Sequence, residues 1–216
     1  MEYKVILYFI LFILAIIYYN IKDSTTREGL TSMDNIVLVG DSILNNANYV
    51  SPGLTVYDLI KSKHENVQMY AADNSAIKDV IKQVENMPNK FNTKNTYIFV
   101  SAGGNDILNL SIHQDEESTK NLFNMYLLLI KAIKQKFPNA NIVALNIYYP
   151  PNPYYKIFYK TVEMWNNLLM KNKTIQGYSV ININKMLTSE DDFTRDIEPS
   201  DIGGEKIADA ITEFKL

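Results

Sequence analysis

Short apolar runs alternate with amphipathic segments along most of the chain. Five runs have the length and composition of buried strands, at 35–39, 67–72, 96–101, 141–147 and 178–183. Segments with apolar residues at helical spacing, or with helix start and stop signals, lie at 54–63, 75–87, 116–137, 156–171 and 203–214. Strands that alternate with helices predict a parallel sheet covered by helices on both faces. We therefore expect a three-layer α/β/α fold with a five-stranded parallel sheet.

One further apolar run, 5–21, precedes this pattern and is apolar except for its tyrosines and Asn20. As a helix it would reach roughly 26 Å, close to the roughly 30 Å of a bilayer core. Tyrosines near both ends suit the two membrane interfaces, and no small-residue cleavage site follows. The run predicts an uncleaved N-terminal transmembrane helix and is less typical of a signal peptide or a core helix.

The chain therefore divides into three predicted parts: a membrane anchor at 1–22, a polar tether at 23–34 and a flavodoxin-like domain at 35–216. The charges on the two sides of the anchor hardly differ and do not fix its orientation. A long domain behind a short N-terminal tail is normally translocated. We expect a single-pass membrane protein with its domain on the lumenal or extracytoplasmic side.

Composition narrows the chemistry of the domain. The net charge of −3 and the lack of a long basic run give no reason to expect nucleic acid as a partner. Without cysteine there are no disulfides, cysteine nucleophiles or thiolate metal sites. The acidic run 190–192 is more typical of a solvated loop than of a metal site, so we expect neither a metal nor a cofactor.

Two strands end in polar, glycine-containing segments. The run 35–39 stops at Gly40-Asp41-Ser42, and the run 96–101 leads into Gly103-Gly104-Asn105-Asp106. In an open α/β sheet, ligands bind at the carboxyl ends of the strands. The two segments can therefore face each other across one crevice, with Ser42 as a candidate nucleophile.

These segments resemble the blocks of the SGNH (GDSL-type) hydrolases, a family of serine esterases, lipases and carbohydrate deacetylases. Gly40-Asp41-Ser42 matches the nucleophile block and Gly103-Gly104-Asn105-Asp106 the third block. Between them, the segment 70–75 is similar to the second block, with Asn74 in place of the family's glycine. The resemblance covers most of the chain from about Asn35 onward.

The resemblance implies a role for each matching residue. Ser42 would attack an ester carbonyl and form an acyl-enzyme. The oxyanion would be held by the backbone N–H groups of Ser42 and Asn74 and by the side chain of Asn105. Asn tolerates the left-handed conformation better than most residues, so a backbone donor can survive at position 74. We expect Asp41 and Asp106 to brace loops through backbone N–H groups.

The base is the point of departure from the family. Aligning Pro199, Gly203 and the Ile207-Ala208 pair with the last block puts Glu198 where the family has its histidine, with Asp196 one place from the usual aspartate. An unperturbed Glu has a pKa near 4.3, about two units below His, but burial or a nearby carboxylate can raise it. Glu198, with Asp196, is the predicted base system.

Two histidines are the alternatives to this base. His113 follows Asn105 on a loop that leaves the correct edge of the sheet and could swing in. His64 precedes the second strand and is expected at the opposite edge.

The loop 148–155, rich in tyrosine and proline, leaves a strand at its carboxyl end and should line the crevice. We assign Gly104, Tyr148 and Tyr149 to substrate binding, with simple surface packing of the loop as the alternative. Two function classes follow. The first is a membrane-anchored hydrolase of lipid acyl or glycan O-acetyl esters, and the second is a catalytically inactive member of the fold kept as a binding module.

Overall fold

The computed structural model describes residues 30–31, 34–110 and 115–215. The chain divides into a unit of Thr31–Thr212 and a second unit made of the two chain ends. The sheet and all helices named below lie in the first unit.

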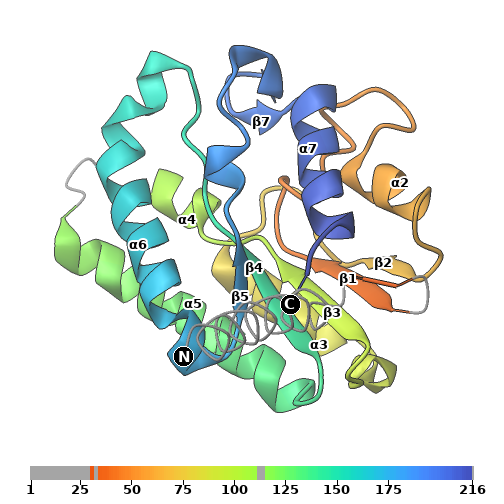
Figure 1. Ribbon diagram of the computed structural model, residues 1–216. Coiled ribbons are helices and arrows are strands. Elements are labelled where there is room, and N and C mark those ends of the chain that lie inside the picture. The colour runs from red at the N-terminus through yellow and green to blue at the C-terminus, as the bar shows by residue number, and fades with distance from the viewer. Residues whose placement is uncertain (1–29, 32–33, 111–114, 216) are drawn as a thin grey trace, which may run out of the picture. The chain divides into compact units, whose positions relative to one another are not determined.

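The sheet has five parallel strands in the order β2-β1-β3-β4-β5 (Figure 1). Their bounds are β1 (Asn35–Val39), β2 (Val67–Met69), β3 (Thr96–Val100), β4 (Asn141–Leu145) and β5 (Ser179–Ile181). The predicted five-stranded parallel sheet is confirmed, in the strand order of flavodoxin-like folds. In this order β1 lies between β2 and β3, so the chain switches direction across the sheet at β1 and β3.

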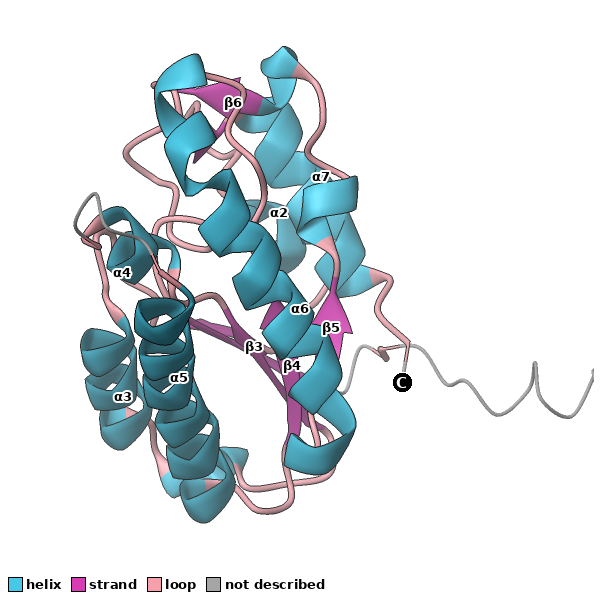
Figure 2. Ribbon diagram, turned by 90° about the vertical axis from the view of Figure 1, so that its left-hand side faces the viewer, coloured by secondary structure: helices cyan, strands magenta, loops and turns pink. Residues whose placement is uncertain are grey.

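Helices cover both faces of the sheet (Figure 2). They are α2 (Val56–Lys61), α3 (Ile77–Asn86), α4 (Gly104–Leu108), α5 (Glu116–Lys136), α6 (Tyr159–Gln176) and α7 (Asp201–Thr212). Helix α2 packs on α7, whereas α5 packs on both α3 and α6. Along β1, Val37 and Val39 join the apolar core under α3, α5 and α6, while Ile36 and Leu38 are equally buried on the other face. This double burial explains why β1 is an unbroken apolar run.

Some boundaries differ from the predictions. The helix expected to start at Lys156 starts at Tyr159, because Pro153–Phe158 forms a 3₁₀ helix (η2), with the Asn152 side chain accepting a hydrogen bond from Tyr154 N. The closing helix, expected at 203–214, spans Asp201–Thr212. Helix α4 and a small hairpin of β6 (Phe193–Thr194) and β7 (Glu198–Pro199) were not predicted. Elements of two to five residues are too short for hydrophobic periodicity to reveal.

The hairpin is held from behind by the buried Asp192. One oxygen of this carboxylate accepts hydrogen bonds from Thr188 N and Ser189 N, and the other lies 2.6 Å from Lys206 Nζ. Two of the three residues at its turn, Arg195 and Asp196, have positive φ angles of 44° and 70°. Because Ser200 N also donates to the Asp192 carbonyl at 2.9 Å, Asp192 holds the hairpin through both its side chain and its backbone.

Within the described residues, no helix is both long and apolar enough to cross a bilayer. The predicted anchor at 1–22 and most of the tether at 23–34 lie outside the described residues.

Candidate active site

The nucleophile turn, Gly40–Ser42, follows β1 at the switch point of the sheet. Gly40 has a φ of 145°, and a Cβ atom there would lie 2.2 Å from the Ser101 carbonyl oxygen on the neighbouring strand's extension. Only glycine fits this approach. Directly after it, the Asp41 carbonyl accepts hydrogen bonds from the N–H groups of Leu44 and Asn45 and turns the chain. Ser42 is thereby presented at the carboxyl edge of the sheet, as predicted.

The Asp41 carboxylate braces this turn. It is buried, and its Oδ1 accepts hydrogen bonds from Ser101 Oγ at 2.6 Å and from Ile43 N at 3.2 Å. Burial raises the pKa of Asp41 to about 6, against the opposing effect of these hydrogen bonds. Asp106 braces the next loop in the same way, because its Oδ2 accepts from Ile77 N at the start of α3. The bracing roles predicted for both aspartates are confirmed.

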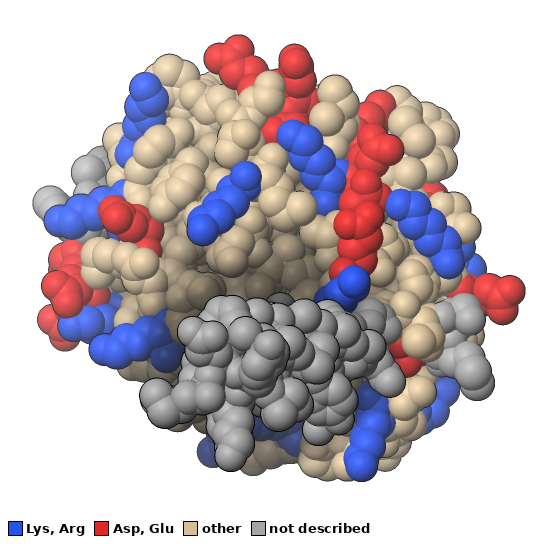
Figure 3. Space-filling view, in the orientation of Figure 1, with Lys and Arg blue, Asp and Glu red and all other residues tan. Residues whose placement is uncertain are grey.

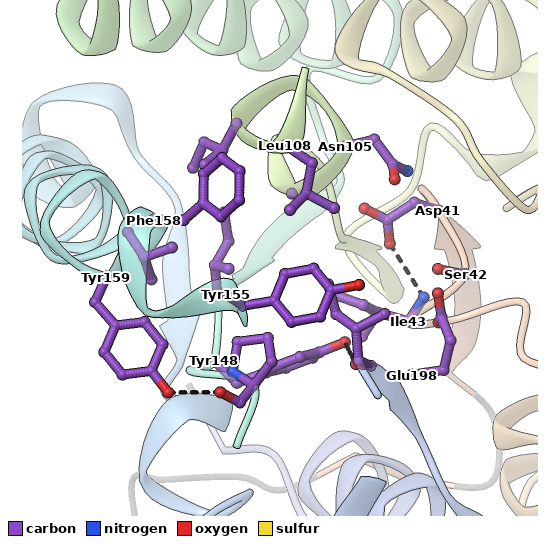
Figure 4. Close-up of a pocket in the computed structure, with 16 residues that line it drawn as sticks. Asp41, Ser42, Ile43, Asn105, Leu108, Tyr148, Tyr155, Phe158, Tyr159 and Glu198 are labelled. Carbon is purple, nitrogen blue, oxygen red and sulfur yellow. Dashed lines mark hydrogen bonds between the residues drawn. The ribbon is translucent and has the colours of Figure 1, made fainter. Parts of the chain in front are cut away.

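Glu198, on β7, lies beside Ser42, with its carboxylate facing the Ser42 hydroxyl (Figure 4). The pKa of Glu198 is raised to about 7, chiefly by burial. The Asp41 and Asp73 carboxylates also raise this pKa, whereas the neighbouring Ser42 hydroxyl and the Arg195 guanidinium lower it. Glu198 Oε2 is buried and has no hydrogen-bond partner among the described residues. The structure thus gives Glu198 the position and the raised pKa that a general base for Ser42 needs near neutral pH.

Asp73 and Arg195 are linked to each other through Tyr49. The Tyr49 hydroxyl lies 2.8 Å from both oxygens of Asp73, and the Arg195 guanidinium lies 5.3 Å from the centre of the Tyr49 ring. Burial, together with its hydrogen bond to Asp73, raises the pKa of Tyr49 to about 12, so the hydroxyl remains a donor. Sequence reasoning missed these residues, because only the fold brings them to Glu198.

Asp196, predicted as a partner of the base, occupies an exposed position in the hairpin turn. The carboxylates that act on Glu198 are instead Asp41 and Asp73. A catalytic role for Asp196 stays a prediction, without a contact to Glu198 that would support it.

The predicted oxyanion donors occupy two elements. Asn105, in the first turn of α4, lines the same pocket as Ser42, and its Nδ2 donates to the Ser75 carbonyl at 3.0 Å. Asn74 is exposed, with a φ of 57°, and is not among the pocket residues. The left-handed conformation expected at position 74 is therefore present, while the role of its N–H in the reaction stays a prediction.

A pocket of about 580 Å³, counting the space open to solvent, extends from the Ser42–Glu198 pair (Figure 4). Its polar end holds Asp41, Ser42, Asn105 and Glu198, and its walls are mainly apolar and aromatic: Ile43, Gly104, Ile107, Leu108, Ile147, Tyr148, Pro150, Tyr155, Phe158, Tyr159, Val162 and Ile197.

Of the three residues assigned to substrate binding, Gly104 and Tyr148 line the pocket. Tyr148 also donates a hydrogen bond from its hydroxyl to the Ile197 carbonyl at 2.7 Å, which ties the wall of the pocket to the strand carrying Glu198. Tyr149 is outside the pocket residues and packs on Tyr159, with ring centres 5.0 Å apart.

The 3₁₀ helix η2 supplies two wall residues that sequence reasoning did not assign. Residues three apart share a face in a 3₁₀ helix. Tyr155 and Phe158 accordingly face the pocket, while Tyr154 and Ile157 are 71% and 60% exposed. The available signal was Pro153 near the start of a short helical turn capped by Asn152.

Neither histidine is placed at the site. His113 lies outside the described residues, and His64, which follows α2, is not among the pocket residues. In the described ranges, no group of three or more His, Asp or Glu side chains is arranged to hold a metal ion.

On the face drawn in Figure 3, acidic and basic side chains are interspersed.

Comparison with known proteins agrees with this site. The GDSL-like lipase/acylhydrolase family matches residues 36–211, and the chain belongs to that family. It is accordingly an esterase or acylhydrolase of the SGNH type. No curated protein matches the chain.

Solved structures share the fold at low sequence identity. A lipolytic G-D-S-L family protein from Veillonella parvula is 20% identical, with a TM-score of 0.65 over 83% of this chain and 97% of that one. A GDSL-like lipase from Parabacteroides merdae is 15% identical, with a TM-score of 0.66 over 86% of this chain and 98% of that one. The lipase Lip_vut3 from a goat rumen metagenome is 18% identical, with a TM-score of 0.66 over 82% of this chain and 95% of that one.

Proposed function

We propose that this protein is a membrane-tethered serine esterase in which Glu198 is the general base and the substrate carries an apolar acyl chain. The observation that carries this proposal is the position of the half-buried Glu198 carboxylate, with a pKa of about 7, beside Ser42 at the polar end of an apolar pocket. A carboxylate with that pKa is half deprotonated near neutral pH and can accept the serine proton.

The reaction follows from this geometry. Ser42 Oγ attacks the ester carbonyl carbon while its proton passes to Glu198. Ser42 N–H, the Asn105 side chain and Asn74 N–H are the proposed donors to the oxyanion that forms. Glu198 then gives its proton to the leaving alcohol as the C–O bond breaks, leaving the acyl group on Ser42. In the second half, Glu198 takes a proton from a water molecule whose oxygen attacks the acyl carbon. It gives that proton to Ser42 Oγ as the acyl–Oγ bond breaks and the acid is released, which restores the free enzyme.

The pocket favours a longer acyl group over acetyl. With an acetyl group bound, most of the pocket's apolar wall would stay in contact with water. An acyl chain of several carbons would instead cover Leu108, Tyr155 and Phe158. Each methylene buried adds about 0.8 kcal/mol, or roughly fourfold in kcat/KM, up to the length of the pocket. A lipid acyl ester is thus the favoured substrate class, ahead of a glycan O-acetyl ester.

The proposed membrane tether rests on the apolar run 5–21 and the polar segment 23–34. A tether of that length reaches roughly 40 Å when extended, which would keep the domain near lipid substrates. Alkaline carbonate extraction tests the tether: the full chain should stay in the membrane fraction and a chain beginning at Lys22 should be released. Release of the full chain would contradict it.

The activity is tested with the full chain in detergent and its Ser42→Ala variant, using p-nitrophenyl esters from acetate to octanoate and a fluorophosphonate label. We expect hydrolysis and labelling that depend on Ser42, with kcat/KM rising from acetate to hexanoate. A preference for acetate would favour the glycan O-acetyl class. If Ser42 neither hydrolyses these esters nor accepts the label, the inactive binding module is the better interpretation.

A further inference from the structure

A glutamine on α3 makes a two-point contact with the backbone of the nucleophile turn. Gln83 Oε1 accepts a hydrogen bond from Gly40 N at 2.8 Å, and Gln83 Nε2 donates to Gly40 O at 2.9 Å. Its amide therefore pairs with Gly40 as a neighbouring strand would, one residue beyond the end of β1. The Gly40 carbonyl also accepts a hydrogen bond from Ala72 N at 3.0 Å, so Gln83 supplies the acceptor for Gly40 N and a second donor to Gly40 O.

The same glutamine reaches the loop that orients Asn105. Gln83 Nε2 also donates to Ser75 Oγ at 3.0 Å, and Ser75 Oγ donates onward to the Ala72 carbonyl at 2.7 Å. The Ser75 carbonyl in turn accepts from Asn105 Nδ2 at 3.0 Å. An unbroken path of hydrogen bonds and one residue's backbone therefore joins Gly40, Gln83, Ser75 and Asn105.

Gln83 is a polar residue next to the buried, apolar side of α3. The buried residues of α3 are Ile77, Val80 and Val84, and Gln83 extends the same stripe. Each hydrogen bond from a half-buried amide must offset its desolvation. All three contacts of the amide go to the nucleophile turn and to Ser75, and Gln83 is not among the pocket residues.

We propose that Gln83 is a positioning residue that sets the separation between the Ser42 nucleophile and the Asn105 oxyanion donor. It touches neither the substrate nor the reacting atoms and acts through Gly40 and Ser75. This inference rests on the proposed function. Because the tetrahedral intermediate must meet Ser42 and Asn105 together, an error in their separation lowers kcat and leaves KM almost unchanged.

The test is steady-state hydrolysis of p-nitrophenyl hexanoate by the full chain carrying Gln83→Met, which keeps the length of the side chain and removes its hydrogen bonds. We expect kcat to fall about 10- to 100-fold, with KM within about twofold. The rate of fluorophosphonate labelling at Ser42 should fall in parallel. Gln135→Met, at an exposed position of α5, is the matched control and should change neither.

A double-variant cycle separates positioning from general stability. Asn105→Ala removes the proposed oxyanion donor, so the separation between Ser42 and position 105 then matters less. In that background, Gln83→Met should lower kcat by less than half of the factor by which it lowers kcat on its own. Ser75→Ala removes one contact only and should give a smaller loss of kcat than Gln83→Met, which keeps the inference testable if the latter does not fold. Three outcomes would overturn the inference. The first is a wild-type kcat in folded Gln83→Met, and the second is full additivity of Gln83→Met with Asn105→Ala. The third is a wild-type kcat in Ser75→Ala when Gln83→Met does not fold. Absence of Ser42-dependent hydrolysis and labelling in the unmodified chain would instead count against the proposed function.

Discussion

The two members of the Ser42–Glu198 pair are held by different kinds of structure. Ser42 follows a central strand of the sheet, and its turn is fixed by Gly40, the buried Asp41 and backbone hydrogen bonds. Glu198 lies on a hairpin of two-residue strands, held by the Tyr148 hydroxyl and by Asp192 behind it. The proposed nucleophile is thus placed by the topology of the sheet, and the proposed base by a short hairpin outside the sheet. Changes near Ser42 should therefore affect stability as well as rate, whereas changes near Glu198 should mainly affect rate and its pH dependence.

The largest effect is expected on the hairpin side, from Glu198→Gln. This change keeps the size of the side chain and removes the proposed base, so kcat/KM for p-nitrophenyl hexanoate should fall about 10³-fold. Glu190→Gln, at an exposed position just before the hairpin, is the control. A rate equal to that of the wild type would mean that another group accepts the Ser42 proton.

The next effect belongs to the sheet side. Gly40→Ala brings a Cβ atom to 2.2 Å from the Ser101 carbonyl, so the free energy of unfolding in urea should fall by at least about 3 kcal/mol. Gly53→Ala is the matched control, because Gly53 also has a positive φ of 83° but no atom within 4 Å of the added Cβ. It should cost only about 1 kcal/mol. Equal losses in the two variants would show that the close approach to Ser101 is unimportant.

A smaller effect is expected from Tyr148→Phe, which releases the Ile197 carbonyl next to Glu198. One hydrogen bond contributes about 1 kcal/mol to stability, so the free energy of unfolding should fall by no more than about that amount, while a shift of the hairpin that carries Glu198 should lower kcat roughly fivefold. Tyr149→Phe, outside the pocket, provides the comparison. A larger loss of stability than of rate in Tyr148→Phe would contradict the division between the two regions.

The smallest expected effect is a shift of the pH profile. Glu198 must be deprotonated to act, so kcat/KM should rise with pH through an inflection near its pKa of about 7. Asp73→Asn removes a charge that raises this pKa and should move the inflection to lower pH. Arg195→Gln removes a charge that lowers it and should move the inflection to higher pH. Shifts in the same direction would show that the inflection does not report Glu198.

The sheet side could be predicted from sequence and the hairpin side only in part. The apolar run of β1 and the Gly-Asp-Ser that follows it place Ser42, because parallel strands share a carboxyl edge. Glu198 was found by alignment of Pro199 and Gly203 with a family pattern, since the two-residue strands carry no periodic signal. Asp73, Tyr49 and Gln83 escaped because their roles arise from contacts between segments far apart in sequence, although a glutamine on the apolar stripe of α3 was a usable sign.

The two-faced 3₁₀ helix η2 also has a consequence for how substrate range can be altered. Tyr155 and Phe158 shape the pocket from one face of a short segment, and that segment carries neither Ser42 nor Glu198. A combinatorial library restricted to these two positions would therefore sample acyl-chain preference without exploring the intolerant positions at the nucleophile turn. If the proposed function holds, such a library would show whether acyl-chain preference can be changed without replacing Ser42 or Glu198.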